Sequence, residues 1–381
     1  MSDVRPQPSA AAAHAAFRAR SRFSSLDGLR FFCILAVLWH HSPVLSALGS
    51  PPPLLTRGFL GVDFFFVLSG FLITTLLLRE AERDGRFSLR GFYWRRFLRI
   101  VPVYFFLVTA VSAYYLLVKG EWQYAPLVPF YYLFLANFLT ASIPLLYPMW
   151  SLGVEEQYYL VWPLLLLVLP RRAVLPVLVG LIALNVAGIM GLLGVSGPVI
   201  GPLRLALPNA TYAPILLGSA LAVVLDRPQG FALLFRVLGH RSAPLWTAAL
   251  VVAAAWAGPA DLRGLPNLAI HLAMAACLAS LVLREDHRLR PLLTWRPIAR
   301  VGEISYGIYL YHLIGLHIGN SLAARLPGGL SDNPWAVLLL YLPISILLAE
   351  ISYRTLEAFF RRFRHGRPSR SVPADGAARA Q

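Results

Sequence analysis

The length, composition and charge of this chain are those of an integral membrane protein. It has 381 residues, of which 57% are hydrophobic and only 14% are charged, and this balance excludes an ordinary soluble domain. The net charge of +16 does not indicate a nucleic-acid partner, because the basic residues lie between apolar runs and form no basic groove or stacking face.

Ten apolar runs follow one another along the chain, separated by short charged or Pro/Gly-rich stretches. A helix that crosses a bilayer needs roughly 20 apolar residues. The alternating strands of a membrane barrel are absent from the sequence, so we predict an all-α polytopic membrane protein with about ten transmembrane helices. The predicted helices cover residues 26–42, 58–78, 101–118, 151–169, 173–193, 211–225, 243–258, 268–283, 303–321 and 335–353.

A further apolar stretch, residues 127–139, is short for a crossing. With the N-terminus inside, 28 of the 34 Lys and Arg residues fall in cytoplasmic segments, as the positive-inside rule requires. A full crossing at 127–139 would invert every later loop and move Arg171, Arg172 and the basic stretch 284–300 outside. We therefore predict a re-entrant or interfacial segment at 127–139, with both termini in the cytoplasm.

The two ends of the chain are predicted to lie outside the membrane domain. Residues 1–23 contain no small-residue cleavage site at signal-peptide distance, so we expect the first helix to be retained behind a loose cytoplasmic tail. Residues 359–381 are basic, short and polar, which predicts a disordered cytoplasmic tail. One membrane domain, residues 24–358, remains between them.

Charged and imidazole groups inside an apolar helix are costly, so each is a candidate functional residue that faces the bundle interior. The first predicted helix carries Asp27 and Arg30 at its cytoplasmic start and His40 and His41 near its far end. Arg30 and His41 are about three helical turns apart, on one face and roughly 16 Å from each other, and could line one conduit. Alternatively, Asp27 and Arg30 form a helix-start ion pair and the histidines meet the headgroup region.

The second predicted helix places Asp63 and Ser69 in apolar surroundings. Gly61 and Gly70 permit close contact with neighbouring helices, because they lack a side chain. We expect Asp63 to be paired with another group inside the membrane, since an unpaired charge there is costly.

Two arginines stand at the entrance to the third predicted helix. Arg96 and Arg99 are i,i+3 neighbours, a spacing suited to binding the phosphates of an anionic ligand at the cytoplasmic face. Basic residues at this position also fix orientation and bind anionic lipid. For the adjacent Arg95 this second explanation is the better one.

The fourth predicted helix opens with Trp150 and carries Glu155, Glu156 and Gln157 about a turn inside its apolar run. A buried carboxylate is costly unless it is paired or protonated, so at least one of the glutamates should meet an Arg or a His. Glu156 could face another side and be merely interfacial.

The ninth predicted helix carries Ser305, Tyr306 and His312 at helical spacing. These groups could hold a polar substrate, while anchoring by an aromatic belt is the alternative. No metal site is predicted, because metal-ligand spacings of His or carboxylates are absent. Cys33 and Cys277 both lie inside apolar runs and are not placed as nucleophiles.

Five motifs occur along the chain in a fixed order. They are Leu26-Asp-Gly-Leu-Arg30 with His41, Gly61-Val-Asp-Phe-Phe-Phe-Val-Leu-Ser-Gly-Phe71, Arg96-x-x-Arg99-Ile-x-Pro102, Trp150-Ser-Leu-x-Val-Glu155-x-Gln157-Tyr-Tyr and Ser305-Tyr306-x-x-Tyr309-Leu-x-His312. Together they resemble the acyltransferase-3 family of bacterial membrane O-acyltransferases, over roughly residues 24–358. Each motif alone is weak, but a chance coincidence of all five is negligible.

The resemblance implies a multi-pass protein of the bacterial cytoplasmic (inner) membrane, in agreement with the topology deduced from the charges. It also implies transfer of an acyl group, commonly acetyl, to a hydroxyl of a cell-surface polysaccharide or its lipid-linked precursor. The donor would be cytoplasmic acyl-CoA, a co-substrate and not a permanently bound cofactor. Some relatives carry a C-terminal extracytoplasmic esterase-like domain; since this chain ends without one, we expect direct transfer or a separate extracytoplasmic partner.

The resemblance also suggests roles for individual residues. An Arg separated by ten residues from a His is the family's proposed catalytic signature, here Arg30 and His41. We expect His41 to act as general base toward a sugar hydroxyl and Glu155 to orient its imidazole or relay its proton. Arg96 and Arg99 would receive the phosphates of acyl-CoA, with Arg30 closer to the thioester. Supporting roles are predicted for Asp27, Asp63, Ser69, Trp150, Gln157, Ser305, Tyr306 and His312.

Two alternatives remain open from the sequence. An acyltransferase of this family could act on a small molecule such as a macrolide or an oligosaccharide, because the motifs do not distinguish acceptors. A proton-coupled transporter would also place His, Glu and Arg inside the membrane, although no repeat symmetry stands out.

Overall fold

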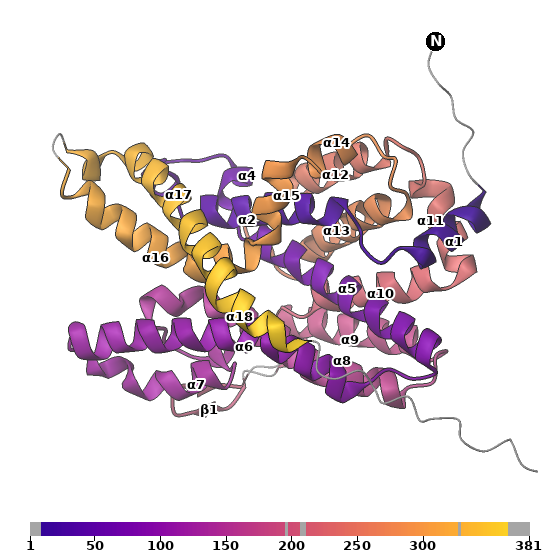
Figure 1. Cartoon of the computed structure of the whole chain (residues 1–381), viewed down its shortest axis with the longest axis horizontal. Helices are drawn as coiled ribbons and strands as arrows, with labels where there is room; N and C mark the ends of the chain where they lie inside the picture. The colour runs from indigo at the N-terminus through magenta and orange to yellow at the C-terminus, as the bar shows by residue number, and fades with distance from the viewer. Residues whose placement is uncertain (1–8, 195–196, 206–210, 327–328, 365–381) are drawn as a thin grey trace, which may run out of the picture.

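The chain folds into a bundle of α-helices. The computed structural model describes residues 9–194, 197–205, 211–326 and 329–364, and all ten predicted apolar runs are α-helices in it (Figure 1). The all-α prediction is thereby confirmed, since the described residues contain one short strand pair besides helices and turns. The ten helices are α2 (Ser25–His40), α5 (Leu60–Asp84), α6 (Leu89–Ala113), α8 (Trp150–Val168), α9 (Val174–Ile189), α10 (Ala213–Asp226), α12 (Ala243–Ala257), α13 (Leu265–Leu283), α16 (Ser305–Ala323) and α17 (Pro334–Ser352).

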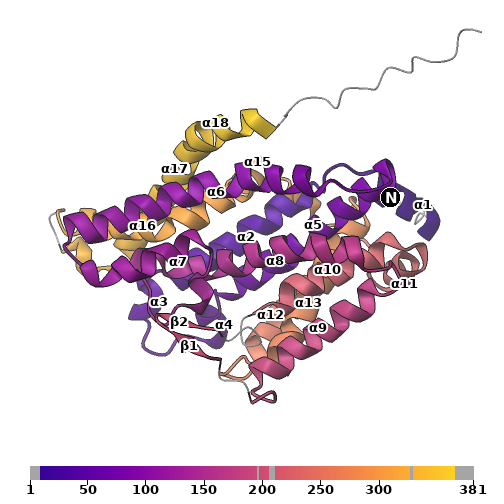
Figure 2. The same cartoon turned by 90° about the horizontal axis from the view of Figure 1, so that it is seen from below.

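Shorter elements connect these helices. The antiparallel strands β1 (Val199–Ile200) and β2 (Leu203–Arg204) form the strand pair. The short α-helices are α1 (Ala10–Ala19), α3 (Pro43–Ala47), α4 (Pro53–Thr56), α7 (Val128–Tyr132), α11 (Pro228–Leu238), α14 (Arg290–Leu293), α15 (Arg296–Glu303) and α18 (Ala358–Arg361). The 3-10 and π turns are η1 (Tyr114–Val118), η2 (Trp122–Leu127), η3 (Ala136–Phe138), η4 (Pro144–Met149), η6 (Leu330–Asp332), η7 (Tyr353–Glu357) and η8 (Arg362–Arg364). The last of the short α-helices, α18, projects at the edge of the bundle beside α6 (Figure 2).

Several helices are suited to a lipid environment. Four helical stretches are long and apolar enough to cross a membrane, namely Leu60–Asp84, Leu89–Val118, Leu265–Leu283 and Pro334–Arg361. The apolar helices α9, α10 and α12 are shorter, with 10–17 residues each. The described part of the chain therefore has the character of a helical membrane protein, as the composition predicts.

The third apolar helix begins earlier than predicted. α6 starts at Leu89 and not near residue 101, because Ser88 caps it by accepting a hydrogen bond from the backbone N–H of Gly91 over 3.1 Å. Hydropathy marks only the apolar part of such a helix. Arg96 and Arg99 therefore lie well inside α6, about two turns from its start.

The centre of the bundle is built from α5 and α10, which lie between α2, α12 and α13 on one side and α6, α8 and α9 on the other (Figure 1). Glycines allow α5 and α10 to touch backbone to backbone. A Cβ atom on Gly70 would lie 1.9 Å from the carbonyl oxygen of Ile215, and one on Gly218 would lie 2.0 Å from that of Val67. The predicted close packing at Gly70 is thereby confirmed.

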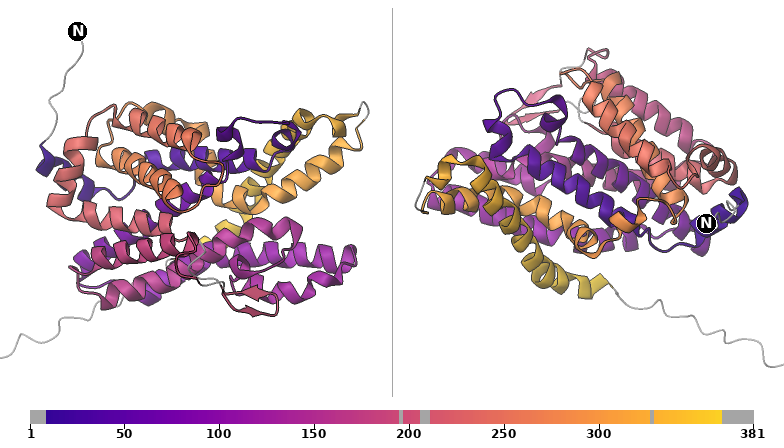
Figure 3. Two further views of the ribbon diagram at one scale, coloured as in Figure 1. Left: turned by 180° about the vertical axis from the view of Figure 1, so that it is seen from behind. Right: turned by 90° about the horizontal axis from the view of Figure 1, so that it is seen from above.

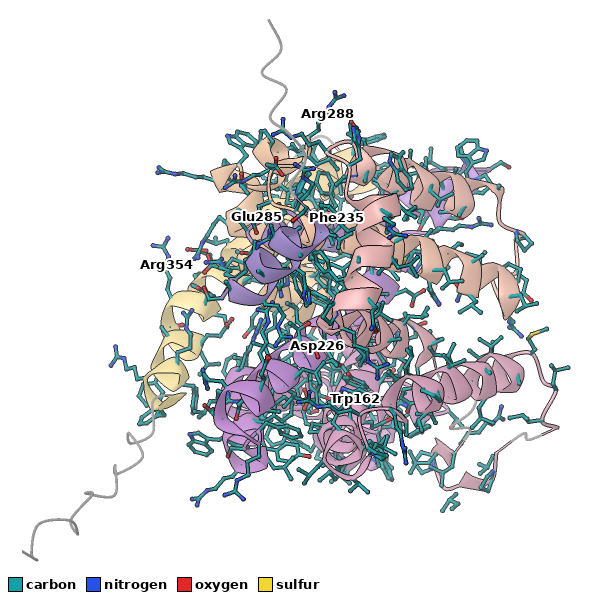
Figure 4. The ribbon with its side chains drawn as sticks, turned by 90° about the vertical axis from the view of Figure 1, so that its right-hand side faces the viewer. Trp162, Asp226, Phe235, Glu285, Arg288 and Arg354 are labelled. Atoms are coloured by element: carbon teal, nitrogen blue, oxygen red, sulfur yellow. The ribbon has the colours of Figure 1, made fainter. Side chains whose placement is uncertain are left out.

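Predicted cytoplasmic connections touch one another at one end of the bundle. Arg20 donates to the carbonyl oxygen of Val282 over 2.6 Å, and Arg227 donates to that of Arg171 over 2.7 Å. Figure 4 looks onto this end, where Glu285 is labelled. These contacts bring predicted cytoplasmic segments together in pairs, residue 20 with the end of α13 and residue 171 with the connection after α10.

The connections at the opposite end are joined by a buried arginine. Arg57 is only 6% exposed and donates to the backbone carbonyl oxygens of Ala255, Gly258 and Pro259, the last two over 2.8 and 2.6 Å. These carbonyls lie at the C-terminal end of α12, where a helix leaves its last acceptors unsatisfied. Figure 3 shows α16 and α17 side by side at the end opposite α1.

The prediction of a loose N-terminal tail is wrong for the residues that form α1. Ser9 caps this helix by accepting from the N–H of Ala12 over 3.2 Å, and Phe17 is 2% exposed, with its ring 5.5 Å from that of Phe231 in α11. A short Ala-rich segment becomes ordered here because its one large apolar side chain is buried. At the other end, 359–364 continue as helical turns, and the predicted disorder of 365–381 lies outside the described residues.

Residues 127–139 form no membrane-spanning helix. The segment consists of α7 between two 3-10 turns, and Phe134 has a positive φ of 55°. Its irregular backbone finds partners in the protein, as it must within a membrane: Gln157 donates to the carbonyl oxygen of Phe134 over 2.9 Å, and Tyr104 to that of Tyr131 over 2.8 Å. This arrangement agrees with the predicted short segment that does not cross.

Asp63 has the buried partner that the sequence predicts. Its Oδ2 lies 3.1 Å from Nε2 of His271 in α13, and the two side chains are 6% and 2% exposed. The pair joins α5 to α13. Removal of one partner from a buried pair typically costs about 3–5 kcal/mol.

We therefore expect Asp63→Ala to lower the free energy of unfolding by about 3 kcal/mol, measured as a fall in melting temperature in detergent. Asp84→Ala is the matched control on the same helix, because Asp84 is exposed and, among the described residues, pairs with its exposed neighbour Arg83 alone, and it should leave stability nearly unchanged. Unaltered stability of Asp63→Ala combined with lost activity would instead indicate that Asp63 supports the active site and not the fold.

Candidate active site

A pocket of about 180 Å³ lies in the centre of the bundle, between α2, α5, α6, α8 and α16. Apolar side chains, among them Phe65, Phe66 and Ile73, form much of its wall. The polar part of the wall consists largely of residues predicted from sequence, although they come from five separate helices. Those residues are Arg30, Ser69, Arg96, Arg99, Glu155, Ser305 and Tyr306.

A wider cavity of about 800 Å³, here called the vestibule, opens at the predicted cytoplasmic side of this pocket. Leu76, Arg96 and Arg99 line both cavities, so the two adjoin. Arg95 donates to Glu80 over 2.7 Å, whereas neither Arg96 nor Arg99 forms an ion pair with a carboxylate among the described residues, although the charges of Glu155 and Glu156 act on Arg96 from nearby. Unpaired guanidinium groups at this junction are suited to binding phosphate.

Glu155 is the acidic group of the pocket, and two hydroxyls hold it. Ser69 of α5 and Tyr159 of α8 both donate to its Oε1 atom, which compensates a carboxylate in the protein interior. The Arg96 guanidinium carbon lies 5.1 Å from the centre of the Tyr159 ring. Within the described structure no hydrogen bond joins Glu155 to His41, so its role in orienting that imidazole stays a prediction.

Arg30 is positioned by the ion pair that the sequence offers as an alternative to a functional role. Its Nη1 atom lies 2.7 Å from Oδ1 of Asp27, and Asp27 also accepts from Arg22 over 2.5 Å. The guanidinium of Arg30 nevertheless lines the pocket. Arg30 can therefore form the ion pair at the start of α2 and also line the pocket, and Asp27 holds its guanidinium in position.

His41 follows the last turn of α2 and lies against His312 of α16, with ring centroids 4.8 Å apart. Nδ1 of His41 is 3.0 Å from the carbonyl oxygen of Val37, and Nδ1 of His312 is 2.6 Å from that of Tyr309. A carbonyl oxygen only accepts, so Nδ1 carries the proton in both bonds. Each Nε2 atom therefore keeps a lone pair that can take a proton.

Tyr309 connects this histidine pair to the pocket. It lines the pocket, its hydroxyl is 2.6 Å from Oγ of Ser151, and its ring centroid is 5.6 Å from that of His312. The histidine pair is thus separated from the pocket by one aromatic side chain.

Six predicted residues lie outside the pocket wall: Asp27, His41 and His312, whose contacts are given above, and Asp63, Gln157 and Trp150. Asp63 pairs with His271, Gln157 holds the 127–139 segment, and the Trp150 ring packs 6.2 Å from that of Phe66. Trp150 thus contacts a side chain of the pocket wall, whereas Asp63 and Gln157 each hold a neighbouring part of the chain in place.

The sequence alone assigned no role to Ser151 or Tyr159, although both lie within its motifs, and it included Tyr309 only among the tyrosine hydroxyls of the ninth predicted helix that could hold a polar substrate. The signal was present in the spacing, because Ser151, Glu155 and Tyr159 are four residues apart and share one face of α8. The place of Tyr309 beside Ser151 could not be recognised without knowing that α16 lies against α8 at this point.

The site combines cations with proton acceptors in a largely apolar enclosure. The guanidinium groups can bind an anionic ligand that enters through the vestibule, and the imidazoles can accept a proton from a hydroxyl. No group of three or more His, Cys, Asp and Glu side chains that could hold a metal ion occurs in the described ranges.

Known proteins that resemble this chain act on peptidoglycan or carry out O-acetylation, according to their names. YrhL of Bacillus subtilis, provisionally named a peptidoglycan O-acetyltransferase, is 30% identical over 87% of this chain and 54% of YrhL. Peptidoglycan O-acetyltransferase OatA of Listeria monocytogenes is 28% identical over 90% of this chain and 56% of its own. O-acetyltransferase OatA of Staphylococcus aureus is 28% identical over 88% and 57%.

The chain spans little more than half the length of these relatives. No solved structure matches it significantly. The family model described as an acyltransferase domain matches residues 23–354, which is nearly the whole chain and includes every helix that lines the central pocket. The chain therefore belongs to the acyltransferase-3 family.

Proposed function

We propose that this protein is a membrane O-acyltransferase that moves an acetyl group from cytoplasmic acetyl-CoA to a hydroxyl of a cell-surface polysaccharide or its lipid-linked precursor. The observation that carries the proposal is the junction of the two cavities, where Arg96 and Arg99, which form no ion pair within the described structure, lie between the vestibule and the central pocket. Phosphates of the donor would bind there while its thioester end enters the pocket beside Arg30.

The proposed topology is a multi-pass protein of the cytoplasmic membrane with ten crossings and both termini inside. The clustering of the predicted cytoplasmic connections at one end of the bundle supports it. So does the irregular course of 127–139, which as a further crossing would invert the later loops.

The proposed chemistry needs two proton transfers, one from the acceptor hydroxyl and one to the departing sulfur. His41 Nε2 takes the proton of the acceptor hydroxyl, whose oxygen forms the new ester bond as the carbon–sulfur bond of the thioester breaks. The sulfur leaves as a thiolate and is protonated to coenzyme A thiol. Because Arg30 and His41 lie about three helical turns apart on α2, the thioester would pass Arg30 and extend across the pocket toward His41. Tyr309 and His312 lie between the pocket and His41 and would align the reacting groups.

A peptidoglycan or other glycan acceptor is proposed from the names of the relatives and from the position of His41. His41 follows the far end of α2, away from the vestibule side, where an acceptor outside the cytoplasm would arrive. A sugar hydroxyl has no useful acidity at neutral pH, so a general base such as an imidazole is required.

Mass spectrometry of surface glycans from a gene-deletion strain and its parent tests this function. We expect the deletion to remove an acetyl mass from one sugar, and the wild-type gene to restore it. An unchanged glycan profile, with purified protein that still consumes acetyl-CoA, would direct the search to small-molecule acceptors. Failure to consume acetyl-CoA would contradict the proposal and favour a transporter.

A further inference from the structure

One wall of the vestibule lies outside the part of the chain that matches the family. Residues 18–21, at the end of α1 and just after it, line the vestibule together with side chains of α5 and α6. The family match begins only at residue 23. Residues 18–21 therefore lie outside the matched range, at the entrance of the central pocket.

Residues 18–21 are held in place by contacts with the bundle. Arg79 of α5 donates to the carbonyl oxygens of Phe17 and Arg20 over 2.8 and 2.5 Å, and its guanidinium carbon is 5.2 Å from the centre of the Phe17 ring. The other side of Phe17 packs on Phe231 of α11. The position of Arg20 at the vestibule is thus fixed by contacts with two helices of the bundle.

The vestibule carries an excess of positive charge. Seven arginines and two glutamates line it. Ion pairs with carboxylates occupy three of the arginines, in the pairs Arg18–Glu82, Arg83–Asp84 and Arg95–Glu80. The arginines that have no such ion pair among the described residues are Arg20, Arg79, Arg96 and Arg99.

Arg20 keeps donors available for a ligand. One of its guanidinium nitrogens donates to the carbonyl oxygen of Val282 over 2.6 Å, which leaves other N–H groups of the five that an arginine carries. Burial lowers the pKa of Arg20, and the carboxylates of Glu285 and Asp286 act in the opposite direction. An arginine remains charged at neutral pH in either case.

We propose that Arg20 and the segment after α1 form, with Arg96 and Arg99, a binding site for the phosphates at the nucleotide end of the acyl donor. This inference rests on the proposed function. A donor such as acetyl-CoA carries its phosphates at one end and its thioester at the end of a long arm. The adjoining cavities fit this division, because the wide one is basic and the inner one is small and largely apolar.

An anionic lipid headgroup would offer the same phosphate chemistry at the cytoplasmic surface. The arrangement favours the donor because the basic cavity leads directly to the pocket through Arg96 and Arg99. A lipid site would need no such connection. The experiment therefore separates the two sources of phosphate.

The test compares donors that differ only in the nucleotide. The full-length protein is placed in bilayer discs of phosphatidylcholine, and KM is measured for acetyl-CoA and for acetyl-pantetheine, which lacks the nucleotide phosphates. We expect Arg20→Gln to raise KM for acetyl-CoA about tenfold, as for a lost charge-assisted hydrogen bond, and to leave KM for acetyl-pantetheine unchanged. Arg20→Lys should recover part of the loss.

Two further variants show whether the effect of Arg20→Gln could come from misfolding of that variant alone. Ser21→Glu adds a negative charge at an exposed position of the vestibule wall and should also raise KM for acetyl-CoA alone. Arg288→Gln is the matched control, because Arg288 is exposed at the same end of the bundle (Figure 4) but does not line the vestibule. It should behave as the wild type.

Three outcomes would overturn the inference while the proposed function stands. Equal rises of KM for both donors would give Arg20 a purely structural role. An effect that appears only when phosphatidylglycerol is added would assign the site to lipid. A wild-type protein that uses both donors with equal KM would show that no nucleotide phosphates are recognised. If the wild type transfers from neither donor, the proposed function itself fails.

Discussion

Replacement of His41 by alanine is expected to abolish acyl transfer while the protein remains folded. The imidazole donates its Nδ1 proton to the carbonyl oxygen of Val37, so that Nε2 is available as the base. Loss of a general base lowers kcat by about 10²- to 10⁴-fold. The measurement is acetyl transfer in membranes that contain equal amounts of variant and wild-type protein, followed by the acetyl content of the glycan.

His40→Ala is the matched control, since it removes an imidazole from the neighbouring residue. The His40 ring lies 5.1 Å from that of His41 and 5.7 Å from that of Phe59, whereas the His41 ring is the one that lies against His312, at 4.8 Å. We expect His40→Ala to retain most of the activity. Full activity of His41→Ala would exclude this residue as the base, and equal losses in both variants would indicate a disturbed end of α2.

The double replacement Arg96→Gln with Arg99→Gln is expected to raise KM for the acyl donor by about 10²-fold or more. Each guanidinium that binds a phosphate contributes about 1.5–3 kcal/mol, and 1.4 kcal/mol corresponds to a factor of ten. KM for the acceptor should change little, because these arginines lie at the vestibule side of the pocket. Initial rates with donor and acceptor varied separately provide both constants.

Arg95→Gln serves as the control for this variant. Arg95 belongs to the same helix and also lines the vestibule, but its charge is paired with Glu80 at 2.7 Å. We expect only a small change in KM for the donor. Similar losses for donor and acceptor in the double variant would indicate that Arg96 and Arg99 fix the orientation of α6 and do not bind phosphate.

Hydropathy and charge predict the helices of this protein well. Each of the ten apolar runs is an α-helix, and 127–139 is short and irregular. Where the prediction fails, the helix continues beyond the apolar residues: α6 extends through its basic segment to Leu89. The order of α1 could not be foreseen, because it depends on burial of Phe17 against Phe231, more than two hundred residues later in the chain.

The sequence predicts many residues of the candidate site, but it does not predict how they are arranged in space. Intramembrane charge identified Arg30, Glu155 and Arg99, which line one pocket. A sequence does not state which helix faces which, so the pairing of Asp63 with His271 and the contact of His41 with His312 emerge only in three dimensions.

The arginine at the end of α12 has a consequence for the surrounding lipid. α12 has 15 residues and is therefore about 22 Å long, shorter than the roughly 30 Å of an average hydrocarbon core. Since Arg57 satisfies carbonyls at its C-terminal end, the helix can stop below the headgroups without leaving those acceptors bare. We expect the bilayer to thin beside α12 to match it, so that this protein should respond to membrane thickness.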